Sequence, residues 1–282
     1  MSSRRAYLAA VAGVGLAGCV GAPPETTGDQ SGDTTGDSPS DTATPTDAAP
    51  PPDVDIVATA VQYSFRHVER VDWNAVRPAA GQFVAVTVDA GGAEPVPDRE
   101  AFTLVADGEP HDPVAVRDLL PSDLGVPSGP YVPEERGTRG WLVFDVPAQL
   151  ESAPSLRVET DGGSGEWSLD VETALAPPPA WDWSASIPET VSRDETFDIS
   201  VTAENVGDGR GTFRGAVNFS YPRYQPKGFD LALAPGESAT ATVPASSENA
   251  ESGRTLEYGV RTAAGRATVA TSVEGESTES TN

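Results

Sequence analysis

The chain has 282 residues, of which 43 are acidic and 18 are basic, so its formal net charge at pH 7 is −25. A surface this negative repels nucleic acid phosphates, which argues against a nucleic-acid partner. High salt shortens the Debye length to ~3 Å at 1 M and relieves self-repulsion, so the acidic composition, in which Lys227 is the only lysine, fits a halophilic protein.

The first 19 residues predict an export signal that ends in a lipid-attachment site. Arg4 and Arg5 precede a short apolar stretch, below the ~20 residues that a membrane-spanning helix needs. Paired arginines there indicate the twin-arginine route, and residues 3–8 (SRRAYL) resemble its consensus. Residues 16–19 (LAGC) resemble a lipobox, which implies that Cys19 becomes the first mature residue and carries a lipid on its sulfur. The alternative is a soluble chain with an incidental cysteine.

Residues 20–53 predict a disordered, extended acidic linker. They are Thr, Asp, Ser, Gly and Pro with almost no large apolar side chain, so they bury too little surface to offset chain entropy. After a lipid anchor, such a linker holds a folded body clear of the membrane. Because Cys19 is the only cysteine, no intramolecular disulfide is expected, and packed cores must supply the stability.

Residues 54–175 predict a first β-sandwich, since short apolar runs alternate with period two and end in turn signals. In residues 140–147 (GWLVFDVP), the core candidates are Leu142, Phe144 and Val146. The succession GQFVAVTVDA, FTLVADG, GWLVFDVPA, SLRVETDGG and EWSLDVE resembles the immunoglobulin-like extracellular (immunoprotective-type) domain of prokaryotic surface lipoproteins. That resemblance implies a surface-exposed sandwich with no catalytic residues to carry over.

A proline-rich connector, residues 176–181, leads to a predicted second sandwich over residues 182–273 and a polar tail over 274–282. Seven short strands are expected in this domain. Residues 205–209 (NVGDG) and 233–238 (LAPGES) stand at turns and resemble motifs of the cell-adhesion-related immunoglobulin-like domain. The fold class expected for the whole chain is therefore all-β, with two immunoglobulin-like sandwiches after a signal and a linker.

Residues 107–139 form a gap longer than ordinary loops, which makes it a candidate partner-binding loop. Its candidate contact residues are Leu119, Leu120 and Tyr131. The alternative, which we favour, is an excursion that caps the sandwich with Leu119 and Leu120 packed on the core.

Three other positions invite a functional reading. Trp181 and Trp183 flank Asp182 where the domains join, and we expect them to be buried between the domains rather than exposed to a sugar or protein partner. Asn218 begins an Asn-Phe-Ser sequon and is a candidate N-glycosylation site.

No constellation in the sequence predicts catalysis or a cofactor. A blue-copper site needs two His and a Cys, but Cys19 precedes the linker and cannot join His67 and His111. A zinc site would need a carboxylate beside these histidines. Calcium could use the oxygens of turns, but Asp and Asn are also the ordinary residues of turns. The turn residues concerned are Asp89, Asp107, Glu109, Asp161, Asn205 and Asp208.

We therefore expect a non-enzymatic lipoprotein on the outer face of the cytoplasmic membrane, with a binding or structural role in the envelope and a protein or polysaccharide partner. One alternative is an accessory subunit of an envelope enzyme or transporter. A third is a hydrolase that uses a carboxylate pair, which would require a cleft lined by two close acids.

Overall fold

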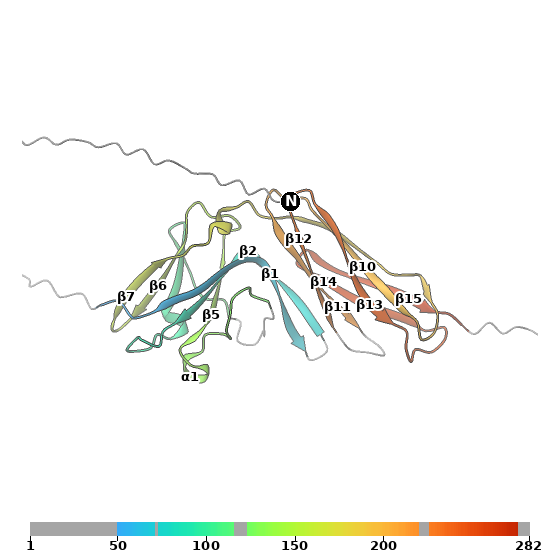
Figure 1. Ribbon diagram of the computed structural model, residues 1–282, viewed down its shortest axis with the longest axis horizontal. Helices are drawn as coiled ribbons and strands as arrows, with labels where there is room; N and C mark the ends of the chain where they lie inside the picture. The colour runs from blue at the N-terminus through green and yellow to red at the C-terminus, as the bar shows by residue number, and fades with distance from the viewer. Residues whose placement is uncertain (1–49, 71–72, 116–122, 220–225, 276–282) are drawn as a thin grey trace, which may run out of the picture. The chain divides into compact units, whose positions relative to one another are not determined.

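The computed structural model describes residues 50–70, 73–115, 123–219 and 226–275. The chain separates into two units, Met1–Thr46 and Asp47–Asn282, and all described secondary structure belongs to the second. These elements build two β-sandwiches, which confirms the all-β, immunoglobulin-like fold class (Figure 1).

The first sandwich pairs a three-stranded sheet with a four-stranded one. The three-stranded sheet has the order β1 (Asp55–Arg70), β2 (Trp73–Asp89), β5 (Arg139–Val146). The four-stranded sheet has the order β4 (Glu109–His111), β3 (Phe102–Ala106), β6 (Ser155–Thr160), β7 (Gly163–Ser168). The described parts of the connections contain three short helices: η1 (Arg99–Ala101), α1 (Pro133–Arg136) and η2 (Glu172–Leu175).

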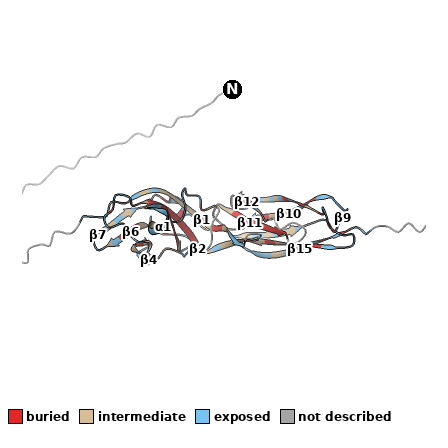
Figure 2. Ribbon diagram, turned by 90° about the horizontal axis from the view of Figure 1, so that it is seen from below, coloured by how far each residue is buried: buried red, intermediate tan, exposed pale blue. Residues whose placement is uncertain are grey.

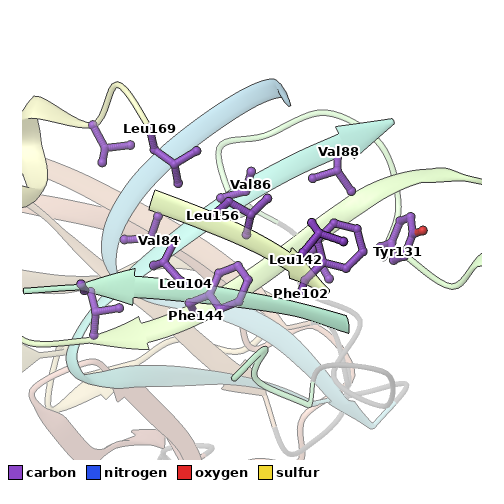
Figure 3. Packing of buried hydrophobic residues seen from close by; sticks show 14 of the residues in the cluster. Val84, Val86, Val88, Phe102, Leu104, Tyr131, Leu142, Phe144, Leu156 and Leu169 are labelled. Carbon is purple, nitrogen blue, oxygen red and sulfur yellow. The ribbon is translucent and has the colours of Figure 1, made fainter. Parts of the chain in front are cut away.

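The core of this sandwich forms where the inward faces of the two sheets meet. Alternation along β2 directs Val84, Val86 and Val88 to this side, where the predicted core residues of β5 also lie. Figure 3 shows these side chains together with those of β3 and β6, namely Val84, Val86, Val88, Phe102, Leu104, Leu142, Phe144 and Leu156. The expected assignment of Leu142, Phe144 and Val146 to the core is confirmed.

The three-stranded sheet is also buried on its other face. Phe83, Trp141 and Val143 point away from the first core and form a second apolar cluster with Phe65 and Ala85. Part of the long segment after β4 covers this cluster, through Val114, Leu124 and Val126. The second half of β2 and most of β5 are therefore buried on both faces. Figure 2 shows buried segments in red within this sandwich.

The second sandwich contains the seven expected strands and one short additional strand. Its three-stranded sheet has the order β13 (Ser238–Ser246), β10 (Thr196–Asn205), β8 (Trp181–Ser186). Its five-stranded sheet has the order β12 (Lys227–Leu233), β11 (Gly211–Phe219), β14 (Thr255–Thr262), β15 (Gly265–Val273), β9 (Thr190–Val191). The inward face includes Ile199, Val201, Phe213, Val217 and Val260, which are fully buried.

The β1–β2 hairpin is much longer than the alternating runs predict. Expected strands end near residue 65 and resume near residue 82, but the ladder continues from Phe65 opposite Arg77 to Arg70 opposite Trp73. Register shifts between Gln62 and Ser64 and between Val68 and Arg70 mark bulges in the hairpin. This extension carries β1 and β2 beyond the first sandwich and onto β11 and β14 of the second.

Candidate binding surface

The residues expected to direct export and anchoring, Arg4, Arg5 and Cys19, lie outside the described residues, as do Leu119 and Leu120. Their roles stay predictions. Within the described ranges, no helix combines the length and apolarity needed to cross a bilayer.

Tyr131 is a core residue of the first sandwich, so its interpretation as a partner-loop residue is wrong. Its side chain is fully buried, and its hydroxyl donates a hydrogen bond of 2.7 Å to the carbonyl oxygen of Pro97. Its ring meets that of Phe102 edge to face at a centroid distance of 5.2 Å (Figure 3). Burial, with smaller contributions from Asp98 and Asp89, raises the pKa of Tyr131 to about 12. The described part of the long segment thus follows the alternative reading, a cap on the sandwich.

Asn218, the candidate glycosylation site, has a residue exposure of 1%. Its Oδ1 accepts a hydrogen bond from the Asn74 backbone N–H at 2.9 Å, and its Nδ2 donates to the Asn74 carbonyl oxygen at 2.9 Å. Both polar atoms are used and no surface is open above them. The folded structure therefore argues against Asn218 as a glycosylation site.

Trp181 and Trp183 lie within the second sandwich rather than between domains, which corrects the expected location. Both are half-buried on β8 and pack against the ring of Phe213, with centroid distances of 5.5 Å and 6.2 Å. They close one side of the second core.

The two turn motifs of the second sandwich meet at one fully buried side chain, Asn205. Its Nδ2 donates to the carbonyl oxygens of Gly209 at 2.7 Å and Leu233 at 3.2 Å, and its Oδ1 accepts the N–H of Gly207 at 3.1 Å. The Oδ1 also accepts the N–H of Ala180, at the end of the connector, at 3.3 Å. Asn205 therefore connects both turns and the connector through hydrogen bonds. Its Oδ1, a candidate calcium ligand, accepts backbone N–H groups instead.

The connector itself packs closely on the first of these turns. A Cβ added at Gly209 would stand 1.6 Å from the Pro177 carbonyl oxygen, so only glycine permits this approach. The N–H of Gly209 donates to the carbonyl oxygen of Pro178 at 3.2 Å. The prolines are thus held against the second sandwich.

Other turn carboxylates also bind backbone groups. Asp107 accepts hydrogen bonds from the N–H groups of Glu151 and Ser152, and Asp89 accepts one from Gly91. Burial lowers the pKa of His67, which lies on β1, whereas His111 lies on β4 in the other sheet. Across the described ranges, no group of three or more His, Cys, Asp or Glu is placed to hold a metal ion.

The extended β1–β2 hairpin meets the second sandwich on a platform of small residues. Strand register places Gly228 opposite Ala216, and Asn218 opposite Gly259, on the outer face of β12, β11 and β14. A Cβ at Gly228 would stand 2.7 Å from Nε of Arg66, and one at Gly259 would stand 3.5 Å from the Trp73 ring. The Arg66 side chain thus lies directly over Gly228, whereas the Trp73 ring lies at an ordinary contact distance from Gly259.

Four charged side chains join the hairpin to this face. The Arg66 guanidinium contacts Asp230 at 2.8 Å and Asp123 at 3.0 Å. Arg214, directly opposite Asp230 in the sheet, contacts Asp123 at 3.3 Å and donates to the Ser64 carbonyl oxygen at 2.9 Å. The cluster balances two positive and two negative charges. Because desolvation offsets much of the attraction in a partly buried cluster, these ion pairs are weak evidence for added stability.

Beyond this cluster the same face carries a group of arginines around Trp73. The guanidinium carbons of Arg70 and Arg261 lie 5.4 Å and 5.5 Å from the centroid of the indole ring. Arg261 and Arg266 stand directly opposite each other on β14 and β15. A hollow of about 280 Å³ opens here, lined by Trp73, Gly259, Arg261, Arg266, Ala267 and Thr268.

Sequence reasoning missed this whole face, because residues 66–81 (RHVERVDWNAVRPAAG) lack clean alternation and contain a proline. A signal was present nonetheless. Glycines inside predicted strands, such as Gly228 and Gly259, mark places where another backbone or ligand comes close. The pairing of arginines with a tryptophan in an acidic chain is the second signal.

No protein-family model and no curated protein matches the chain. Among solved structures, the CARDB domain of a Pyrococcus furiosus protein, in complex with di-metal ions, is similar at 15% identity and a TM-score of 0.30, over 35% of this chain and 96% of that one. A β-glucosidase from Listeria innocua in complex with glucose is similar at 16% identity and a TM-score of 0.28, over 34% of this chain and 16% of that one. Its isofagomine complex gives 18% identity and a TM-score of 0.29, over 46% and 19%. This chain thus spans less than a fifth of the β-glucosidase chains.

The class of protein is therefore defined by its own strand pairing: an all-β protein of two immunoglobulin-like sandwiches. They belong to one unit and are joined by a long hairpin.

Proposed function

We propose that the protein is an exported lipoprotein, anchored through Cys19 on the outer face of the cytoplasmic membrane, with a non-catalytic binding or structural role in the cell envelope. The acidic linker holds the two sandwiches away from the membrane. The first sandwich is of the immunoprotective-type extracellular class, and the second is of the cell-adhesion-related class.

The observation that supports a non-catalytic role concerns the candidate functional residues of the sequence: their polar atoms form hydrogen bonds within the fold. Asn205, Asn218, Asp107 and Tyr131 direct their polar atoms at backbone groups of the same chain. Their hydrogen bonds hold turns and strands in place, which is what a display scaffold requires. The surface left for a partner is the outer face of the sheets.

The assignment of the second sandwich rests on its two turn motifs. The NVGDG and LAPGES turns lie side by side because Asn205 donates to Leu233 and Gly236 donates back to the Asn205 carbonyl oxygen at 2.8 Å. The sequence likeness to the cell-adhesion-related domain thus falls on residues that cooperate in space.

The anchor is tested by fractionating cells that produce Cys19→Ser alongside cells that produce the unchanged chain. We expect the unchanged protein in the membrane fraction, with a mature mass that includes acyl groups, and Cys19→Ser in the medium. A matched control, Ser31→Ala in the linker, should fractionate like the unchanged protein. Membrane association of Cys19→Ser, or a mature mass without acyl groups, would overturn the anchor.

The export route is tested separately by Arg4→Lys with Arg5→Lys. This change keeps the charge but removes the paired arginines, so the unprocessed chain should accumulate in the cytoplasm. Normal processing of this variant would contradict the twin-arginine route.

A further inference from the structure

Arg70, Arg261, Arg266 and Trp73 create a cationic surface on a strongly acidic protein. Three other arginines of the described residues form ion pairs with carboxylates of other elements: Arg66 and Arg214 with Asp123 and Asp230, and Arg157 with Glu166. No such ion pair involves Arg70, Arg261 or Arg266 within the described ranges. What distinguishes this place is that three such arginines gather around one indole ring.

The arrangement of these arginines has an electrostatic cost in the protein alone. Like charges directly opposite each other on neighbouring strands repel, and Arg261 faces Arg266 in this way. An anion between the two guanidinium groups would convert the repulsion into two favourable contacts. The guanidinium fork matches the paired oxygens of carboxylates and of tetrahedral oxyanions such as phosphate and sulfate, so groups of these kinds fit this surface.

The indole of Trp73 orients part of this surface. Arg70 and Arg261 both lie near the ring, which restricts their guanidinium groups before any ligand arrives. A restricted side chain loses less entropy on binding. The ring lies over Gly259, and Thr268 adds one neutral polar side chain to the lining.

The hollow beside the ring sets the size of the group that enters. Its volume of about 280 Å³ suits one charged ring rather than a folded segment. None of its described lining residues is acidic, and Glu257, the nearest acid on the same face of β14, lies outside the lining. Gly259 and Ala267 offer apolar contact to the C–H groups of a sugar.

We propose that this surface binds an anionic polysaccharide, with carboxylate or sulfate groups of successive sugars held by Arg261, Arg266 and Arg70. The choice of a polysaccharide deepens the envelope role proposed above and rests on it, because a protein displayed outside the cell meets anionic polymers in the form of surface glycans.

The test measures binding of the full chain to immobilised dextran sulfate and polygalacturonate, with unmodified dextran as the neutral counterpart. We expect binding to both charged polymers and none to dextran. Arg266→Gln, at an exposed position, and Arg261→Gln should each weaken binding about tenfold or more. The matched control is Arg193→Gln, which removes the same charge from an exposed arginine of the same sandwich and should leave binding unchanged.

Each other outcome overturns the proposal. If Arg193→Gln and Arg266→Gln weaken polymer binding equally, the attraction is unspecific. If the protein binds dextran as well as the charged polymers, binding does not depend on the anionic groups. If neither dextran sulfate nor polygalacturonate binds, the proposed site is refuted. Binding of anionic phospholipid vesicles with the same dependence on Arg266, and of no polymer, would assign the surface to a lipid headgroup. Thermal unfolding of each variant checks that the fold is retained.

This experiment is independent of the anchor experiment. If the purified protein binds the charged polymers, but both Cys19→Ser and the unchanged chain are found in the medium, the anchor is refuted and the anion site is retained. If the anchor is confirmed but no polymer binds, the anion site is refuted and the anchor is retained.

Discussion

Asn218 and Asn74 are joined by a reciprocal pair of hydrogen bonds between the side chain of one and the backbone of the other. This pair connects β11 of the second sandwich to β2, near the end of the long hairpin. It is the reason that the outer face of β11 is buried at this point.

The change Asn218→Asp keeps the shape but replaces the donor Nδ2 with an oxygen that faces the Asn74 carbonyl oxygen. A buried charge and an unpaired acceptor together should lower the free energy of unfolding by about 2–4 kcal/mol. Urea denaturation measures this, and Asn249→Asp, at an exposed position, should change stability by less than about 0.5 kcal/mol. Mass spectrometry should find the peptide with Asn218 unmodified; a glycan there would contradict the arrangement.

Gly209→Ala tests the close packing of the proline connector. The new methyl group would overlap the Pro177 carbonyl oxygen, so the connector must move and the turn held by Asn205 must loosen. We expect a loss of about 2–4 kcal/mol in denaturation experiments. Gly275→Ala is the control because no atom lies within 4 Å of the added carbon. Equal stability of the two variants would show that the connector does not pack as described.

Two buried tyrosines should respond oppositely to removal of the hydroxyl. The Tyr131 hydroxyl donates to Pro97, so Tyr131→Phe leaves a buried carbonyl unpaired and should cost about 1–2 kcal/mol. The Tyr258 hydroxyl has no hydrogen-bond partner among the described residues, so Tyr258→Phe should be neutral or stabilising. Thermal melts of both variants give the comparison, and a larger loss for Tyr258→Phe would refute it.

The same tyrosines predict how stability changes at alkaline pH. Burial raises the pKa of Tyr131 and of Tyr258 to about 12, from 10.0 for an ordinary tyrosine. The folded state favours the neutral phenol, so this contribution is complete below pH 10 and is lost as the pH rises through 10 toward 12. Urea midpoints should fall across that interval, and the fall should be smaller in a Tyr131→Phe, Tyr258→Phe double variant. An equal fall in both proteins would assign the effect to other groups.

Much of the fold could be predicted because the strands that form the cores carry a clear period of two. In β2, Val84, Val86 and Val88 alternate with Phe83 and Ala85, and this pattern alone assigns both faces. The turns could be located from glycines, as at residues 205–209. The burial of Trp141 and Val143 was harder to predict, because it depends on the segment after β4, which covers them.

The cationic surface could not be predicted because its members are dispersed along the chain. Trp73 and Arg70 lie on the hairpin, whereas Arg261 and Arg266 follow almost 190 residues later. They meet because the register of β14 and β15 places the two arginines opposite each other and the hairpin extends onto β14. Tyr131 was misread for the related reason that its burial depends on Phe102 and Pro97, which precede it by about 30 residues.

The hairpin covers Gly228, Ala216 and Asn218 of the second sandwich. This cover affects which fragments of the protein would be stable. A fragment that starts at residue 182 would lack the hairpin and expose Ala216 and Asn218, which the intact chain buries almost completely. We therefore expect such a fragment to be less stable than the intact chain, because it also loses the hydrogen bonds between Asn218 and Asn74. Recombination that separates the two sandwiches would carry this cost.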